Sequence, residues 1–541
     1  MRVEGYPAQN FGGAGGSYGF SVSQTSMPYL NGTTLSGTSP GFPYASFLLG
    51  LVNNGSIGYP VNPKLGKHQL GFFAQDTWKV TRKFTLDYGI RYDYSTYLKE
   101  QYGRAANFSP TTPNPTVGGY PGAVLFEGGG TGHCNCDFAK VYPWGFGPRL
   151  GAAYQINSKT VFRAGFGVVY ASTEANNNAA GGLANANNTF TASAFGNSVT
   201  TLSQGIPTSL RPLPWPNLDP GQFPLTNTAA PSALTAPMID PNAGRPPRQY
   251  QWSVGLQREL SKDMAIEASY VGNRGIWWQG PALLNLNALN TDTLKSRGID
   301  VANAADVALL TQSLSSATVA ARGFRVPYAG FPTGQTLAQS LRPYPQFTNV
   351  NVYWAPLGKT WYDSMQVKLT KRMSHGLSVL STFTWSKSLQ MGAEREPNPG
   401  TTGNATINNV FNRQVNKYLS LHDQPFVSNT SITYVTPRVK LGSGFAGHTT
   451  SWLAQDWTIG AFLQYASGLP IQVPTAQNSL NNQIFQSTFA NRVPGQPLFL
   501  QDLNCHCFDP SNSFVLNPAA WADPAPGQFG TSAAYYSDYR K

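Results

Sequence analysis

A period of two in the apolar and polar residues is the feature that most limits how this chain can fold. In the segment 84–93 an apolar set, Phe84, Leu86, Tyr88, Ile90 and Tyr92, alternates with a polar set, Thr85, Asp87, Gly89, Arg91 and Asp93. Successive side chains of a β-strand point to opposite sides, whereas a helix would mix the two sets on every face. The segment is therefore predicted to be a strand with one apolar and one polar face.

The same alternation recurs in nine further segments along the chain. They are 70–80, 150–156, 160–171, 252–258, 264–270, 365–373, 377–385, 427–435 and 457–465. A tilted strand of about nine to eleven residues crosses an outer membrane, and most of these segments come close to that length.

The connections between these segments alternate between very short and very long. Short turns such as 81–83 and 374–376 join the two members of a pair, whereas the connections that follow run over 98–148, 172–248, 275–361, 390–425 and from 468 onward. This pattern predicts antiparallel strand pairs with short periplasmic turns on one side of a membrane and long external loops on the other. The segment 436–455 is the exception, because it is long although it should be a short turn.

Composition decides what such a sheet can face. Charged residues make up 11% of the 541 residues and aromatic residues 13%, whereas soluble domains carry about 25% charged residues. The longest apolar run, 47–52, is far below the roughly 18 residues of a spanning helix, which excludes a helical membrane protein. The prediction is an all-β chain forming an antiparallel transmembrane β-barrel; the alternative is a soluble all-β protein with core aromatics.

Aromatic residues gather near the predicted strand ends and favour the barrel. The residues on the loop side are Tyr92, Tyr94, Tyr97, Tyr270, Trp385 and Tyr465, and those on the turn side are Trp78 and Trp457. Tyr and Trp are enriched at both membrane interfaces of a barrel. We predict that these residues form the two interfacial girdles.

The charge and the beginning of the chain bear on its partners. The net charge of +12, from 37 basic and 25 acidic residues, is spread without any Lys/Arg run. We expect a weak preference for anionic surfaces or cargo and no nucleic-acid partner. Because residues 1–7 have no apolar signal-peptide core, an exported chain of this kind is expected to lack its N-terminal region here.

The long connections are predicted to be irregular, uncharged, hydrogen-bonding surfaces. Segments such as 175–178 and 398–404 are rich in Asn, Gly, Pro and Thr, which favour turns and loops. The exception is 301–321, which is rich in Ala and Leu, contains no Pro and is predicted to form a short helix within its loop.

The period of two assigns residues to the lumen and to lipid. The lumen-facing candidates for cargo binding are Asp87, Arg91, Asp93, Arg149, Arg163, Glu267, Lys368 and Arg372. The lipid-facing candidates are Phe84, Leu86, Tyr88, Ile90, Phe162 and Phe166. A contact with cargo or with a plug is one role for the charged set; the alternative is a solvated, mutually paired lining, which any wide barrel needs.

Four cysteines form two Cys-x-Cys units in predicted external loops. The units are Cys134 to Cys136, preceded by His133, and Cys505 to Cys507, which enclose His506. Disulfides, across the loops or within a unit, suit an oxidising exterior. If the loops meet, a Zn or Cu site is the alternative; no other cofactor is expected.

Motifs of catalysis are not found in the sequence. There is no Walker A loop, no HExxH and no GxSxG, and Gly165-Phe166-Gly167 lies inside a strand without a following helix. No catalytic residue is assigned, and the chain is predicted not to be an enzyme.

The segments together resemble TonB-dependent receptor barrels. Residues 73–80, Phe-Ala-Gln-Asp-Thr-Trp-Lys-Val, followed by Gly89-Ile90-Arg91-Tyr92-Asp93, are similar to the FxQDxWxV and GLRYD signatures of that family. Further stretches resemble the Oar-like subgroup, which carries a carboxypeptidase-regulatory-like domain; they are 147–154, 160–167, 251–258, 270–275, 362–366, 384–388 and 516–521.

The resemblance covers nearly the whole chain and implies a particular architecture. It implies a 22-stranded barrel that holds an N-terminal plug and is powered by the TonB complex. Residues 1–541 are then expected to be one barrel domain, incomplete at both ends, without the plug, the TonB box, the regulatory-like domain and the last strands.

Three functions follow as hypotheses. The first is TonB-dependent uptake or export of an unidentified cargo, such as a carbohydrate or peptide, through an outer-membrane barrel. The second is a surface adhesion or structural protein whose external loops bind glycans. The third, an outer-membrane hydrolase, requires a catalytic cluster at the barrel rim.

Overall fold

The computed structural model describes most of the chain. The described residues are 2–5, 16–26, 41–58, 65–171, 187–210 except 194, 235–392 except 354, 407–438, 444–476, 484 and 488–536 except 504, 506 and 510. The segments 175–178 and 398–404 and the side chain of His506 lie outside this set.

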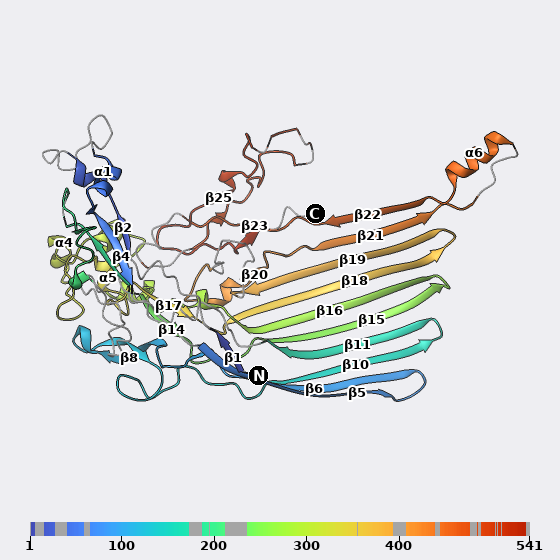
Figure 1. The fold of residues 1–541 in the computed structure, drawn as a ribbon, viewed down its shortest axis with the longest axis horizontal. Helices are drawn as coiled ribbons and strands as arrows, with labels where there is room; N and C mark the ends of the chain where they lie inside the picture. The colour runs from blue at the N-terminus through green and yellow to red at the C-terminus, as the bar shows by residue number, and fades with distance from the viewer. Residues whose placement is uncertain are drawn as a thin grey trace.

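One large antiparallel sheet dominates the described residues, and its strands follow one another in chain order (Figure 1). Its ten long strands are β5 (Leu65–Lys79), β6 (Phe84–Ser95), β10 (Phe146–Asn157), β11 (Thr160–Tyr170), β15 (Arg248–Ser261), β16 (Met264–Trp278), β18 (Gly358–Ser374), β19 (Leu377–Met391), β21 (Phe426–Val435) and β22 (Thr458–Ala466). The short strands β1 (Arg2–Gly5), β7 (Lys99–Glu100) and β20 (Tyr418–Leu419) add to it. All ten predicted strands are confirmed.

The predicted alternation of short turns and long connections is also confirmed. Figure 1 shows the short turns together at the right end of the sheet and the long connections at the left end. The β18–β19 turn contains only His375 and Gly376, with φ angles of 49° and 74°. Positive φ at both positions is the type I′ geometry that matches strand twist. A Cβ on Gly376 would lie 2.3 Å from the Val435 carbonyl oxygen, so glycine is required there.

The long turn-side connection between β21 and β22 contains a helix. The helix α6 (Phe445–Ala454) projects beyond the strand ends (Figure 1). Phe445 and Trp452 are 87% and 73% exposed. The segment that fitted the turn pattern poorly therefore has a structure of its own. None of the described helices is both long and apolar enough to span a membrane.

The long connections carry secondary structure and lie on the loop side of the sheet, from the left end to the middle of Figure 1; we call them the loop layer. Its strands are β2 (Ser17–Gly19), β3 (Leu51–Val52), β4 (Asn54–Gly58), β8 (Ala106–Asn114), β9 (Tyr120–Phe126), β12 (Asn187–Thr191), β13 (Thr200–Thr201), β14 (Thr235–Ile239), β17 (Asn349–Tyr353), β23 (Ile471–Gln472), β24 (Asn491–Arg492), β25 (Trp521–Ala522) and β26 (Tyr535–Tyr536). Its helices are α1 (Pro43–Leu48), α2 (Thr291–Ser296), α3 (Ala304–Thr311), α4 (Ala317–Ala321) and α5 (Leu337–Ser340). The helix predicted over 301–321 is thus two short helices, α3 and α4.

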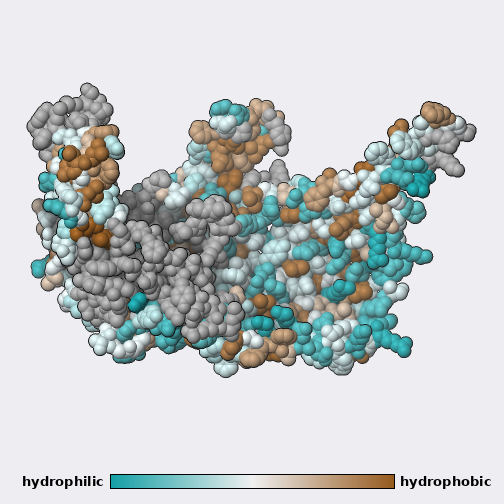
Figure 2. All heavy atoms as spheres, in the orientation of Figure 1, coloured by the Kyte–Doolittle hydropathy of each residue, from teal (hydrophilic) through white to brown (hydrophobic). Residues whose placement is uncertain are grey.

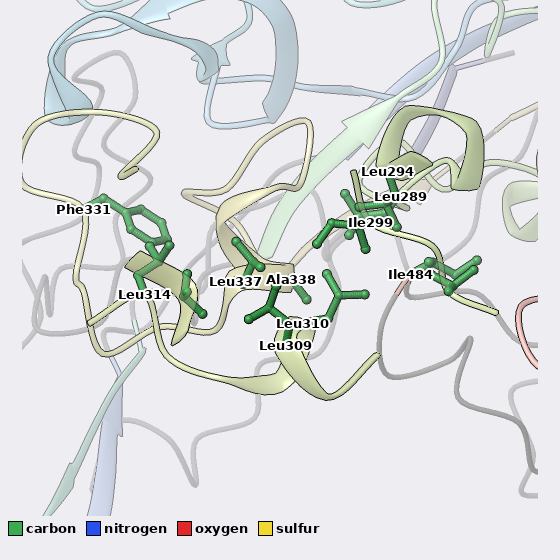
Figure 3. Close-up of a cluster of buried hydrophobic side chains, with 12 residues drawn as sticks. Leu289, Leu294, Ile299, Leu309, Leu310, Leu314, Phe331, Leu337, Ala338 and Ile484 are labelled. Atoms are coloured by element: carbon green, nitrogen blue, oxygen red, sulfur yellow. The ribbon is translucent and has the colours of Figure 1, made fainter. Parts of the chain in front are cut away.

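The loop layer has hydrophobic cores, which corrects the prediction that these connections are only irregular polar surfaces. The largest cluster contains Leu310 and Leu337 from the β16–β18 connection together with Ile484, all 0% exposed (Figure 3). Another joins Phe108 of β8, Ala236 of β14 and Phe347, which come from three different connections. These clusters combine residues far apart in sequence, so local polarity does not reveal them.

Tyr97 is wrongly predicted as a girdle residue, because it is buried in the loop layer. It is 2% exposed and packs in a cluster with Leu65 and Phe138. Its hydroxyl donates a hydrogen bond to the Glu127 carboxylate, which also accepts one from the Phe138 backbone N–H at 3.2 Å. Burial raises the pKa of Glu127, and burial together with the hydrogen bond to Glu127 raises the pKa of Tyr97.

Candidate cargo-binding face

The register of the sheet places all eight charged candidates on one face, which we call the polar face. Arg149 is paired with Gly89 and Gly167, and Arg163 with Ala153 and Gly255. Glu267 and Lys368 are direct cross-strand partners. Because side chains alternate along each strand, the residues that share this face are Asp87, Arg91, Asp93, Arg149, Arg163, Glu267, Lys368 and Arg372.

The opposite face of the sheet, the apolar face, carries the six residues predicted to face lipid. Aromatic pairs contact each other across its strands: Phe84 lies 6.5 Å from Tyr154, Tyr92 4.8 Å from Phe146, and Phe383 6.1 Å from Phe426, measured between ring centroids. Ile90 and Phe166 are 48% and 43% exposed. An exposed apolar surface of this extent is typical of a sheet that faces a nonaqueous phase. Figure 2 shows hydrophilic residues gathered at the turn-side end of the sheet, at the right.

The polar face curves around a hollow of about 1130 Å³ formed by β5, β6, β10, β11, β15 and β16. Most of the lining residues lie on the polar face. Among the predicted candidates, Asp87, Arg91 and Arg149 line it. Between them lie Gly151, Gly165 and Gly167, which leave the floor low because they have no side chains. The hollow therefore presents charged groups around an open backbone surface.

The charges around this hollow are only partly paired with each other. The Arg91 and Asp93 side chains form an ion pair at 2.8 Å, and the Thr77 hydroxyl donates to Asp87 at 2.6 Å. Arg149 is exposed and has no ion-pair partner within the described part of the chain. Its guanidinium can therefore bind an anionic or hydrogen-bonding group that enters the hollow. This favours cargo contact over a wholly self-paired lining at this position.

A second hollow of about 330 Å³ lies at the turn ends of β11, β15, β16 and β18. It is lined by the three remaining turn-side candidates, Glu267, Lys368 and Arg372. Charges of both signs face each other there, so part of this lining is mutually compensated. The two hollows thus contain six of the eight charged candidates, and Asp93 and Arg163 lie on the polar face outside both.

The uncharged part of the site was missed by the sequence analysis, which selected charged residues only. Gln75, Gln251 and Ser253 line the large hollow beside the glycines. They occupy the same alternating positions of their strands as the charged candidates do. Extending the polar face to amides and hydroxyls would have found them.

The cysteines are paired within their own units. Disulfides join Cys134 to Cys136 and Cys505 to Cys507. The His133 ring donates from Nδ1 to the Glu127 carbonyl oxygen at 2.6 Å. No group of residues suited to a metal ion occurs among the described residues. With the thiols paired, a Zn or Cu site would require reduction first, because a metal binds the thiolate.

We expect the oxidised chain to contain no free thiol, since both pairs form within a unit. Alkylation with iodoacetamide before reduction should leave all four cysteines unmodified, and digestion should place each disulfide in a peptide that holds one unit. A peptide that links Cys134 or Cys136 to the second unit would contradict this pairing.

Comparison with known proteins agrees with the sheet and its two faces. Residues 2–539 match the model of a family described as outer membrane beta barrel domain. The chain belongs to this family. The prediction of an antiparallel transmembrane β-barrel in the outer membrane of a Gram-negative-type bacterium is thereby confirmed. No curated protein matches the sequence significantly.

Solved structures similar to this outer membrane beta barrel domain include receptors and a transporter, all of low sequence identity. The alcaligin outer-membrane receptor FauA of Bordetella pertussis is 10% identical, with a TM-score of 0.28 over 76% of this chain and 43% of its own. The ferric yersiniabactin uptake receptor FyuA of Yersinia pestis is 9% identical, with a TM-score of 0.26 over 77% and 39%. The copper transporter OprC is 10% identical, with a TM-score of 0.28 over 78% and 39%. The match spans less than half of each of these structures, and at these scores we infer nothing further from them.

Proposed function

We propose that this barrel domain belongs to a TonB-dependent outer-membrane transporter and that its polar face carries the cargo. The observation on which this rests is the hollow of about 1130 Å³, lined by Asp87, Arg91 and Arg149 around a glycine floor. A wide barrel with a polar interior provides a path through the membrane for a polar solute. The sequence resemblance to TonB-dependent receptors supports the TonB complex as the energy source.

The chemistry of the hollow limits the class of cargo. Amide and hydroxyl groups from Gln75, Gln251 and Ser253 line the same hollow as Arg149. Such a mixture hydrogen-bonds to carbonyl, hydroxyl and carboxylate groups. We therefore propose a polar cargo such as a carbohydrate or a peptide. We propose no catalytic role for the chain.

The test is uptake by cells that make the complete protein. Cells with and without an active TonB complex would be grown in medium that contains pools of oligosaccharides or peptides, and mass spectrometry would measure how much of each pool remains in the medium. We expect depletion of one pool only when the TonB complex is active. Arg149→Gln should lower that uptake about tenfold, because a hydrogen bond to a charged group is lost. Arg82→Gln, in the exposed β5–β6 turn, is the matched control.

Two outcomes would contradict the proposal. Uptake that persists without TonB activity would exclude the TonB complex as the energy source, and uptake unaffected by Arg149→Gln would exclude the hollow as the cargo site.

The packed loop layer supports a second candidate function, surface adhesion, because stable external clusters can present a binding surface. Cell binding to glycan arrays without uptake of any pool would favour that candidate.

A further inference from the structure

A strained tryptophan marks a second site, at the loop-side end of the sheet. The ladder between β16 and β18 shifts register between Ile276 and Trp278, which makes Trp277 a bulged residue. Its φ angle is 64°, a conformation that is an outlier for a bulky side chain. Bulges re-aim side chains, and strain of this kind persists only where the surroundings enforce it. The surrounding structure therefore fixes the position and direction of the Trp277 side chain.

Two arginines lie against this indole. The guanidinium carbon of Arg248 lies 4.2 Å from the ring centroid, and that of Arg245 lies 5.4 Å from it. The Tyr142 ring is 5.1 Å away in an edge contact. Arg248 also lies 5.0 Å from the Tyr250 ring and 5.9 Å from the Tyr170 ring. We call Tyr142, Tyr170, Arg245, Arg248, Tyr250 and Trp277 the Trp277 cluster.

The positive charge of the Trp277 cluster is not balanced within the described part of the chain. Neither Arg245 nor Arg248 forms an ion pair with any described carboxylate. Nε of Arg248 is buried without a hydrogen-bond partner, and its Nη1 donates only a long bond, 3.4 Å, to the Tyr170 hydroxyl. Two like charges on one ring repel each other, and an unsatisfied buried donor is costly. An anion with several acceptor oxygens beside the two guanidinium groups would relieve their repulsion.

The position of the Trp277 cluster indicates where that anion comes from. Arg248 is paired in the ladder with Tyr170 and Ile276, and these positions continue the apolar face that includes Phe166 and Trp252. The cluster lies where β11 and β16 reach their loop-side ends. In a barrel of the outer membrane, that end of the lipid-contacting face is level with the outer headgroups.

We propose that the Trp277 cluster binds the phosphate of an anionic lipid in the outer leaflet. A planar guanidinium donates two parallel hydrogen bonds to phosphate oxygens, and the aromatic rings that contact it hold its plane in a fixed orientation. Basic residues beside interfacial aromatics attract anionic lipid. The net charge of +12 is consistent with an anionic surface as partner. This site is independent of the cargo hollow, because it lies on the opposite face of the sheet.

Lipid retention by the full chain, purified from outer membranes, tests the proposal. The protein would be placed in phosphatidylcholine nanodiscs with and without diphosphoryl lipid A, and the lipid retained after detergent release would be measured by native mass spectrometry. We expect lipid A to be retained over phosphatidylcholine. The Arg245→Gln/Arg248→Gln double variant should weaken that retention at least about tenfold, because charged hydrogen bonds to phosphate are lost.

Control variants separate the site from general charge and from folding. Arg163→Gln removes an equal charge from the polar face and should leave lipid retention unchanged. Arg248→Lys keeps the charge but loses the planar guanidinium, and it should give a loss of lipid A retention between those of the native chain and the double variant. If the double variant does not fold, as judged by the mobility of unheated protein in gels, Arg245→Gln and Trp277→Phe provide the comparison.

Three results would overturn the proposal. The first is equal retention of lipid A by the native chain and by the folded arginine variants. The second is an equal loss on Arg163→Gln, which would show a general effect of charge. The third is binding of inorganic phosphate by the detergent-solubilised protein at the affinity of lipid A, which would assign the site to a free phosphate instead.

Discussion

Replacing Phe108 with alanine is expected to loosen the loop layer while leaving the long strands of the sheet folded. Phe108 is 2% exposed, and its ring lies 4.6 Å from that of Tyr344 and 5.8 Å from that of Phe347. It therefore joins β8 to the β16–β18 connection. Truncating a buried phenylalanine to alanine costs about 3 to 5 kcal/mol, because both transfer energy and packing are lost.

We expect the loss to stay local, because none of the residues in the cluster around Phe108 lies in a long strand of the sheet. Hydrogen exchange measured by mass spectrometry should show faster exchange in 106–126 and 344–350 and unchanged exchange in β10, β11 and β15. Phe514→Ala is the matched control, since Phe514 is 83% exposed. Faster exchange throughout the long strands would contradict the separation of the loop layer from the barrel.

The long strands could be predicted because each has two faces in different surroundings. In β6 the apolar face and the polar face alternate without a break from Phe84 to Asp93, so the period of two is visible in the sequence alone. The residues at which the strands begin and end could be predicted less well from the sequence. In β18 the alternation predicts 365–373, whereas the strand begins at Gly358. Outside the apolar band the ladder hydrogen bonds continue, but the contrast between the two faces no longer requires apolar residues.

The loop layer could not be predicted because its contacts are not local. Ile484 packs with Leu310 and Leu337, more than a hundred residues earlier in the chain. No periodicity connects such segments, and their Asn, Gly and Pro content conceals the buried positions between them. Tyr97 illustrates the same limit. Its place just after β6 suggests a girdle residue, whereas it is buried in a cluster with Phe138 and Ala243, which come later in the chain.

The candidate site was predicted in part. The alternation of side chains along each strand predicts that Asp87, Arg149 and Arg163 share one face, and the register of the sheet agrees with this prediction. The position of the hollow depends on sheet curvature and on which glycines adjoin one another, and neither follows from a single strand. The position of Trp277 could not be predicted for a similar reason, since a bulge breaks the alternation of apolar and polar residues.

A lysine at Phe166 is expected to impair assembly of the barrel far more than a lysine at the adjacent Gly165. Phe166 lies on the apolar face and is 43% exposed, whereas Gly165 lies on the polar face and lines the hollow. A lysine that faces lipid near the middle of the membrane costs about 2 to 4 kcal/mol, and one that faces the lumen costs little. A Cβ on Gly165 would meet the Ser253 Oγ at 3.3 Å and the Leu150 carbonyl oxygen at 4.0 Å, so a side chain fits there with a small adjustment of the hydroxyl.

Folding into lipid vesicles, followed by urea titration, measures the difference between these variants. Phe166→Lys should unfold at a clearly lower urea concentration than the native chain, and Gly165→Lys at nearly the native one. Ile90→Lys and Asp87→Lys repeat the comparison on β6, where the two side chains lie on opposite faces. Equal tolerance of lysine on both faces would contradict the assignment of the apolar face to lipid, and with it the assignment of the polar face to cargo.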